Sequence, residues 1–146
     1  MHGLGNDYVF LDGRNGLDLD EQAVVAISDR RTGVGGDGVI VLERPRDAAH
    51  DARMSIFNAD GSDGGVCGNG LRCLAAWIVG DGLIEKDSLT VEIGGGVVHL
   101  RVDEASGTGR SLVSVELPPP RFACAEIPAR VPGLKGTDHV VDRAVG

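Results

Sequence analysis

The sequence predicts an α/β fold of the mixed α+β type, and three observations favour it. Strand-like and helix-like patterns follow one another in the order strand, helix, two strands, helix, three strands. The 146 residues, 42% of them hydrophobic and 25% charged, suit a globular domain with a modest core. The 23 glycines form no repeat but gather in a few clusters, as is useful where the backbone must approach a ligand closely. Those clusters direct the search for a functional site.

The first half of the chain has one helical pattern among short apolar runs. Val24 and Ile27 belong to an apolar stripe at helical spacing, and either Asp18 or Asp20 can cap the helix that this stripe predicts. The glycine-rich segment 33–38 ends this helix and leads into the next strand. The expected elements are a strand at Tyr8–Leu11, a helix at Glu21–Arg30, and strands at Val39–Leu42 and Arg53–Phe57.

The second half opens with a polar, glycine-rich segment, residues 58–70, that leads into a second helix. Leu71, Leu74 and Ile78 recur at helical spacing, and Gly80 can terminate the helix. Cys67 should therefore lie at or just before a helix N-terminus. The expected strands that follow are Leu89–Ile93, Val97–Val102 and Leu112–Leu117, the first two joined as a hairpin through residues 94–96.

A run of prolines, Pro118–Pro120, interrupts this pattern and indicates a domain boundary. We expect residues 1–118 to form an N-terminal domain. Residues 119–146 should form a linker and the start of a second domain, where only Val140-Val141 indicates a further strand.

The charge balance opposes several classes of partner. A net charge of −8 and a pI near 4.8 work against binding to nucleic acid or anionic lipid. No apolar stretch approaches the roughly 20 residues of a membrane helix, and the N-terminus lacks a basic segment followed by an apolar core. We therefore expect no nucleic acid and no membrane as partner, a cytoplasmic location, and a small molecule or another chain as the ligand.

Three cysteines are present, Cys67, Cys73 and Cys124, and their odd number and irregular spacing suit neither a disulfide framework nor a zinc site. We expect reduced thiols and no bound metal. Cys73 follows Cys67 by six residues, a helical rotation of roughly 600° that points it away from the first thiol. Core packing is the expected role of Cys73, and a structural or incidental role that of Cys124.

Cys67 carries the chemistry that the sequence predicts. Unpaired N–H groups and the positive end of the helix dipole favour a thiolate there, and the same N–H groups can bind a carboxylate. The amides of Asn58 and Asn69 can donate to a carboxylate and accept from an ammonium group, so an amino acid is the natural guest. The residues alone leave a second interpretation equally open, in which Cys67 is a buried cysteine before an ordinary capped helix.

The chain resembles the diaminopimelate epimerase family in four segments that occur in the family's order: MHGLGNDY at 1–8, GVGGDG at 33–38, FNADGS at 57–62 and CGNGLRC at 67–73. The resemblance implies a curled mixed sheet around a central helix that begins near Cys67. It also implies inversion at one α-carbon, which interconverts LL- and meso-diaminopimelate on the route to lysine, without pyridoxal phosphate or any other cofactor.

The resemblance also implies roles for particular residues. Cys67 would be one of two acid/base cysteines, Gly68 and Asn69 would hold the reacting carboxylate, and Asn6 and Asn58 would bind substrate. The family's other cysteine lies in an Ala-Cys-Gly-Ser/Thr-Gly motif of a second, similar domain, and these 146 residues contain no such motif. We therefore expect an incomplete enzyme with one catalytic cysteine, a homodimer as in the family, and a complementing C-terminal half.

Two alternatives stay open on the sequence. The chain could belong to another cofactor-independent isomerase of the same fold, acting on proline, hydroxyproline or a phenazine precursor. It could instead be a non-catalytic module that binds an amino acid or pairs with a partner chain carrying the other half.

Overall fold

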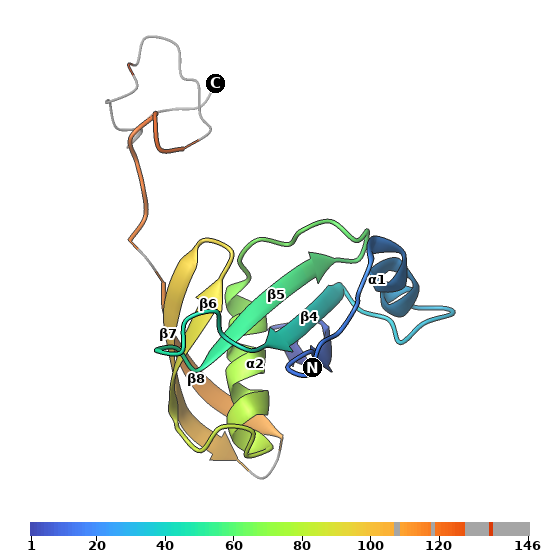
Figure 1. Cartoon of the computed structure of the whole chain (residues 1–146), viewed down its shortest axis with the longest axis horizontal. Coiled ribbons are helices and arrows are strands. Elements are labelled where there is room, and N and C mark those ends of the chain that lie inside the picture. The colour runs from blue at the N-terminus through green and yellow to red at the C-terminus, as the bar shows by residue number, and fades with distance from the viewer. Residues whose placement is uncertain (107–108, 118, 128–134, 136–146) are drawn as a thin grey trace.

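A six-stranded mixed sheet curls around one helix in the computed structural model, which describes residues 1–106, 109–117, 119–127 and 135 (Figure 1). The central helix is α2, Gly68–Gly80. The strands follow one another across the sheet in chain order: β3 (Val9–Asp12), β4 (Gly38–Glu43), β5 (Ala52–Asn58), β6 (Ser88–Ile93), β7 (Gly96–Ser106) and β8 (Arg110–Glu116). This architecture confirms the mixed α+β class and the helix enclosed by a curled sheet.

Parallel and antiparallel pairs alternate along the first part of this sheet. Strand β3 is parallel to β4 across the connection that contains helix α1, Glu21–Ser28. Strand β5 is parallel to β6 across the connection that contains α2. The other neighbours are antiparallel. Because parallel neighbours need a long crossover, each helix falls between the two strands of a parallel pair, and α2 takes the concave face.

The main core forms between α2 and the concave face of the sheet. Leu71, Leu74 and Ile78 are fully buried on α2, as the helical spacing predicts. They pack in one cluster with apolar side chains of the sheet, including Ile40, Leu42, Met54, Ile56, Leu89, Val91, Val98 and Leu100. This burial fixes the position of the α2 N-terminus, because the helix cannot slide or rotate without exposing these side chains.

Helix α1 covers the opposite face of β4. Val24 is fully buried against Val39 and Val41. Of the two N-cap candidates, Asp20 is the one used, because its carboxylate accepts from the Ala23 N–H at 2.7 Å. The helix ends at Ser28, two residues before the expected end, since the Asp29 side chain draws the following N–H groups into a turn.

A short hairpin that the sequence analysis missed precedes the sheet. Strands β1 (His2–Gly3) and β2 (Asn6–Asp7) pair in antiparallel fashion around a two-residue turn. Both turn residues have positive φ, 56° at Leu4 and 92° at Gly5, as the favoured hairpin turn requires. A Cβ on Gly3 would lie 3.1 Å from the Asn69 carbonyl oxygen, so the hairpin rests directly on the first turn of α2.

The hairpin of β6 and β7 is confirmed, with Ile93 paired to Gly96 across the glycine turn. Strand β7 is longer than expected because β8 pairs with it past a register shift between Val102 and Glu104. Pro118 and the Val140-Val141 segment lie outside the described residues, so the expected boundary between residues 118 and 119 stays a prediction. In the described part of the chain, no helix is long and apolar enough to cross a bilayer.

Candidate active site

Cys67 is the N-cap residue of α2, as its place in the sequence predicts. Its sulfur accepts a hydrogen bond from the Gly70 N–H at 3.4 Å, and this occupies one of the first-turn N–H groups that have no partner within a helix. The thiol is free and partly exposed, whereas Cys73 is buried. Cys67 is therefore not the buried cysteine of the second interpretation, and it can meet a ligand.

Asn6, from β2, presents its carbonyl oxygen to this sulfur. The Cys67 S–H donates to Asn6 Oδ1 at 3.4 Å. On its other side, Asn6 Nδ2 donates to Asp37 Oδ2 at 2.8 Å. A carboxylate can only accept, so Asp37 fixes which end of the amide faces Cys67. The hairpin thereby contributes a fixed acceptor to the thiol.

An ion-pair network holds Asp37 and the hairpin together. Arg30 contacts both oxygens of Asp7, at 2.9 and 2.6 Å, and Asp37 Oδ1 at 3.0 Å. The Asp7 N–H donates to Asp37, and the Asp37 N–H donates to the Asp7 carbonyl at 2.7 Å. The Arg30 guanidinium lowers the pKa of Asp7 from 3.8 to about 2, chiefly through these hydrogen bonds. This network supports Asn6 without touching Cys67.

Tyr8 is the third group on the sulfur. Its hydroxyl donates to Cys67 Sγ at 3.5 Å. Its backbone N–H and C=O pair with Met1 at 2.9 and 3.0 Å, so the residue is pinned at both ends. Burial, together with the hydrogen bond to Cys67, raises the pKa of Tyr8 to about 12. The phenol therefore keeps its proton at neutral pH.

Gly68 and Asn69 form the first two positions of α2, directly beside the thiol. Their backbone N–H groups donate to no described residue, as expected for the start of a helix. The Asn69 side-chain oxygen accepts from Arg72. The two free N–H groups next to the thiol suit an anion such as a carboxylate.

Asn58 is the last residue of β5. Its side chain makes no hydrogen bond with the cluster formed by Cys67, Asn6, Tyr8 and Asp37. Its amide donates to Ser62 Oγ at 3.0 Å, within the turn that leaves the strand. The connection to the cluster runs through backbone, because the Ala59 N–H donates to the Asp37 carbonyl at 3.1 Å. The structure thus joins Asn6 directly to Cys67 but leaves Asn58 at the edge of the site.

The sequence-predicted assignments of the other two cysteines differ in outcome. Cys73 is buried in the core, as its helical phase predicts, and burial raises the pKa of its thiol. Cys124 is partly exposed in the segment after β8, and its structural role stays a prediction. No described residues form a group of three or more His, Cys, Asp or Glu side chains suited to a metal ion.

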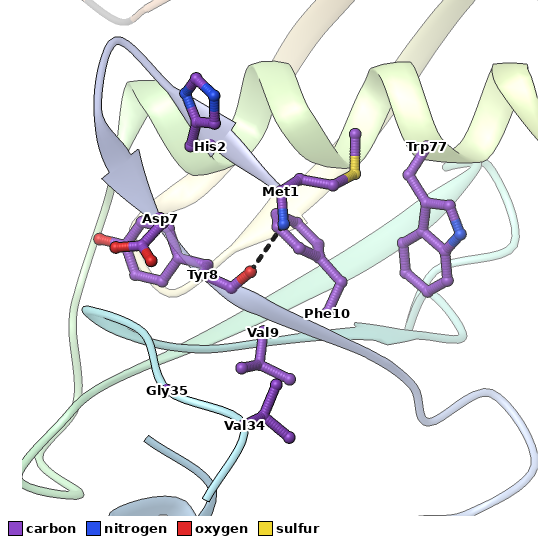
Figure 2. A pocket seen from close by; sticks show the side chains of 9 residues that line it. All are labelled: Met1, His2, Asp7, Tyr8, Val9, Phe10, Val34, Gly35 and Trp77. Carbon is purple, nitrogen blue, oxygen red and sulfur yellow. Dashed lines mark hydrogen bonds between the residues drawn. The ribbon is translucent and has the colours of Figure 1, made fainter. Parts of the chain in front are cut away.

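An open groove of about 600 Å³ lies beside this cluster (Figure 2). Its lining includes Tyr8, Phe10 and Trp77, and the two aromatic rings of Phe10 and Trp77 meet edge to face with centroids 6.0 Å apart. Figure 2 shows the bond from the Met1 ammonium to the Tyr8 carbonyl at the side of this groove. The groove shares Tyr8 with the site, but Cys67 does not line it.

The chain matches the family model described as diaminopimelate epimerase over residues 1–122, most of its length. It belongs to the diaminopimelate epimerase family. The family assignment expected from the four sequence segments is therefore confirmed, and the family is one of isomerases, as expected. The cluster around Cys67 is made of residues from the first, second and fourth of these segments.

Curated relatives carry the same name. The chain is 45% identical to the diaminopimelate epimerase of Thioalkalivibrio sulfidiphilus over 130 residues, which is 88% of this chain and 45% of that protein. It is 39% identical to the diaminopimelate epimerase of Caldanaerobacter subterraneus over 141 residues, which is 97% of this chain and 50% of that protein. The chain thus spans about half the length of the curated relatives that it matches.

Two solved structures share the fold of this family member. A phenazine biosynthesis protein of the PhzF family from Bacillus anthracis superimposes with a TM-score of 0.56 at 23% identity, over 77% of this chain and 35% of that one. A methylitaconate-delta-isomerase superimposes with a TM-score of 0.53 at 15% identity, over 71% of this chain and 56% of that one. At such low identities the likeness concerns the fold alone.

The side chains of Tyr8, Asp37 and Arg30 were given no role at the site in the sequence analysis. Tyr8 follows Asn6 by two positions, and side chains two residues apart in an extended chain point to the same side. This spacing is a signal that Tyr8 and Asn6 contact the same group, here the Cys67 sulfur. Asp37 stood in the second family segment without an assigned role. Arg30 gave no signal, because its two partners lie 23 and 7 positions away and meet it only in the folded chain.

Proposed function

We propose that this chain carries one half of the active site of a diaminopimelate epimerase, with Cys67 as one of its two acid/base thiols. The observation that carries the proposal is the sulfur at the start of α2, which contacts Asn6, Tyr8 and the Gly70 N–H at once. Family membership supplies the substrate class, and the whole protein would interconvert LL- and meso-diaminopimelate.

In the proposed reaction, the Cys67 thiolate removes the proton from the substrate α-carbon. The electron pair left behind spreads into the adjacent carboxylate, which gains negative charge. The free N–H groups of Gly68 and Asn69 would bind that carboxylate and stabilise the developing charge, because preorganised donors act strongly where water is excluded. A second thiol, from residues outside this chain, would return a proton to the opposite face.

Asn58 and Asn6 have different places in this proposal. Asn58 lies at the edge of the cluster, where its side-chain oxygen Oδ1 accepts no hydrogen bond from the described residues and could meet an ammonium group of the substrate. Both polar ends of the Asn6 amide are already bonded, to Cys67 and to Asp37. We therefore propose that Asn58 binds substrate. The main role proposed for Asn6 is to accept the hydrogen bond of the Cys67 thiol.

The test is exchange of the substrate α-hydrogen in deuterated water, catalysed by the full-length protein that contains this chain. Wild-type protein should invert diaminopimelate and incorporate deuterium at Cα. Cys67→Ser should lose at least about a hundredfold in rate, as expected when a positioned acid/base group is replaced by a much weaker one. Cys124→Ser is the matched control and should retain the rate.

A substrate panel distinguishes the proposal from the other isomerases of this fold. Proline, hydroxyproline and diaminopimelate are offered in parallel, and inversion of diaminopimelate alone is the expected result. Turnover of proline or hydroxyproline in its place would overturn the substrate assignment. Wild-type activity in Cys67→Ser would overturn the mechanism.

A further inference from the structure

The sulfur of Cys67 is surrounded by two donors and one acceptor. The Tyr8 hydroxyl and the Gly70 N–H point toward it, at 3.5 and 3.4 Å, and Asn6 Oδ1 receives its proton at 3.4 Å. A thiol and a thiolate need opposite partners, since a thiol donates its proton and a thiolate only accepts. This site provides for both forms.

The acceptor is held in one orientation. Asp37 binds the NH2 end of Asn6, and Arg30 with the Asp7 N–H holds Asp37. Rotation of the amide would turn two N–H bonds toward the sulfur and would direct the Asn6 oxygen against a carboxylate. The Asn6 oxygen therefore stays directed at Cys67.

The donors are held as well. Tyr8 is only 9% exposed, and Met1 pins its backbone on both sides. Because the pKa of Tyr8 is raised to about 12 by burial and by its contact with Cys67, its hydroxyl remains a donor throughout the range in which thiols ionise. The Gly70 N–H belongs to the backbone of α2 and cannot move away.

We infer that Tyr8 is a positioning residue for Cys67: its hydroxyl stabilises the thiolate, and Asn6 receives the S–H when the sulfur carries a proton. The inference rests on the proposed acid/base role of Cys67. During proton abstraction, the proton moves from the substrate α-carbon to the sulfur, and the new S–H turns to Asn6. Tyr8 keeps its own proton throughout and forms no bond with substrate.

The direct test is the pH profile of Cys67 alkylation in the 146-residue chain. Iodoacetamide reacts with thiolates, and mass spectrometry follows Cys67 and Cys124 separately in one sample. In Tyr8→Phe, which removes only the hydroxyl, the midpoint for Cys67 should move up by about one pH unit, the worth of one hydrogen bond to a charged group. The midpoint for Cys124 should not move.

Trp77→Phe is the matched control variant. Like Tyr8→Phe, it removes one hydrogen-bond donor from a partly buried aromatic side chain, because Trp77 Nε1 donates to Asp81 at 2.9 Å. This hydrogen bond does not involve Cys67. The Cys67 midpoint should remain at its wild-type value in this variant. A folded Tyr8→Phe protein with an unchanged midpoint would overturn the inference.

A second measurement leaves every side chain in place. Tyr8 is the only tyrosine in the chain, so growth on tyrosine labelled with 13C at Cζ gives one labelled NMR signal. Its chemical shift should change with pH at the same midpoint as Cys67 alkylation, and the change should vanish in Cys67→Ala. A signal that stays constant through that midpoint would contradict the inference even if Tyr8→Phe fails to fold.

The two proposals fail in different ways. The alkylation and NMR measurements need no substrate, so they report on the Tyr8 contact even if the protein does not act on diaminopimelate. Conversely, inversion of diaminopimelate that depends on Cys67, combined with an unchanged alkylation midpoint in Tyr8→Phe, would leave the proposed function intact and remove Tyr8 from it.

Discussion

At the scale of single residues, the two side chains that contact the Cys67 sulfur come from far away in the sequence. Asn6 and Tyr8 lie 61 and 59 positions before the cysteine. Their positions depend on Asp7, Asp37 and Arg30, none of which touches the sulfur. The charges of this ion-pair network should therefore affect the stability of the hairpin. Through the hairpin they should also affect how firmly Asn6 and Tyr8 are held against Cys67.

The first prediction concerns the Asp7 carboxylate. Its pKa is lowered from 3.8 to about 2 by Arg30, so the ionised form is favoured by folding. The stability that it contributes is present above pH 3.8 and is lost as the pH falls through about 2. Urea unfolding should show Asp7→Asn to be less stable than wild type at pH 7, with the difference shrinking over that acidic window.

Glu85→Gln is the control for this prediction. It removes an exposed carboxylate that makes no ion pair or hydrogen bond with the described residues. This variant should follow the wild type across the same pH range. A difference for Asp7→Asn that persists undiminished at the lowest pH would show that the carboxylate acts through something other than its charge.

The second prediction concerns Leu4 at the tip of the hairpin. Leu4 has φ of 56° and is 91% exposed, so it is strained in the left-handed region without burial to offset the strain. Leu4→Asn should raise the free energy of unfolding by about 1 kcal/mol, because Asn tolerates this conformation. Leu112→Asn, at an exposed leucine in β8, should give no such gain in chemical denaturation.

At the scale of elements, the α2 N-terminus is held against the sheet by a close contact. A Cβ on Gly70 would lie 2.5 Å from Cδ1 of Ile40, a side chain that is fully buried. The helix therefore approaches β4 as closely as a glycine allows. Since Gly70 also donates its N–H to Cys67, the packing of α2 and the position of the sulfur are coupled.

The third prediction uses two glycines of this one helix. Gly70→Ala should destabilise the chain by about 1–3 kcal/mol, as overpacking of a filled core does, and should shift the pH profile of Cys67 alkylation. Gly80→Ala has nothing within 4 Å of the added methyl group and should stabilise by up to about 1 kcal/mol. Equal effects of the two changes on thermal unfolding would contradict the close contact at Gly70.

At the scale of the whole molecule, the proposed reaction uses one thiol of this chain, Cys67, on one face of the substrate. The chain spans about half the length of the curated relatives that it matches. Inversion at a carbon requires removal of a proton from one face and delivery to the other. In the proposed reaction, the second acid/base group would come from residues outside these 146.

The fourth prediction follows from that geometry. The 146 residues alone should bind diaminopimelate in calorimetry but should not invert it, whereas the protein that continues through the second half should do both. Cys67→Ser within the longer protein should bind substrate without inversion. Inversion by the 146-residue chain itself would show that a second acid/base group is present among these residues.

Local patterns were enough to predict most of the fold. The apolar stripe of α2, the cysteine at its start and the glycine turn before β7 are all short-range features, and each was confirmed. The hairpin at residues 2–7 was missed because its strands are two residues long and hold glycine and polar side chains. The predicted strand at Val97–Val102 was shorter than β7, because the end of β7 depends on its pairing with β8.

The sequence by itself determined the family, the mixed fold and the position of Cys67 at a helix start, because these depend on residue order and on spacing within single elements. Only the tertiary structure decided what surrounds the sulfur. Tyr8 and Asn6 reach Cys67 because the first hairpin packs on α2, and Arg30 with Asp37 fixes that hairpin. Hydrogen bonds between distant segments leave no periodic signal in a single sequence, since they depend on how the sheet curls around the helix.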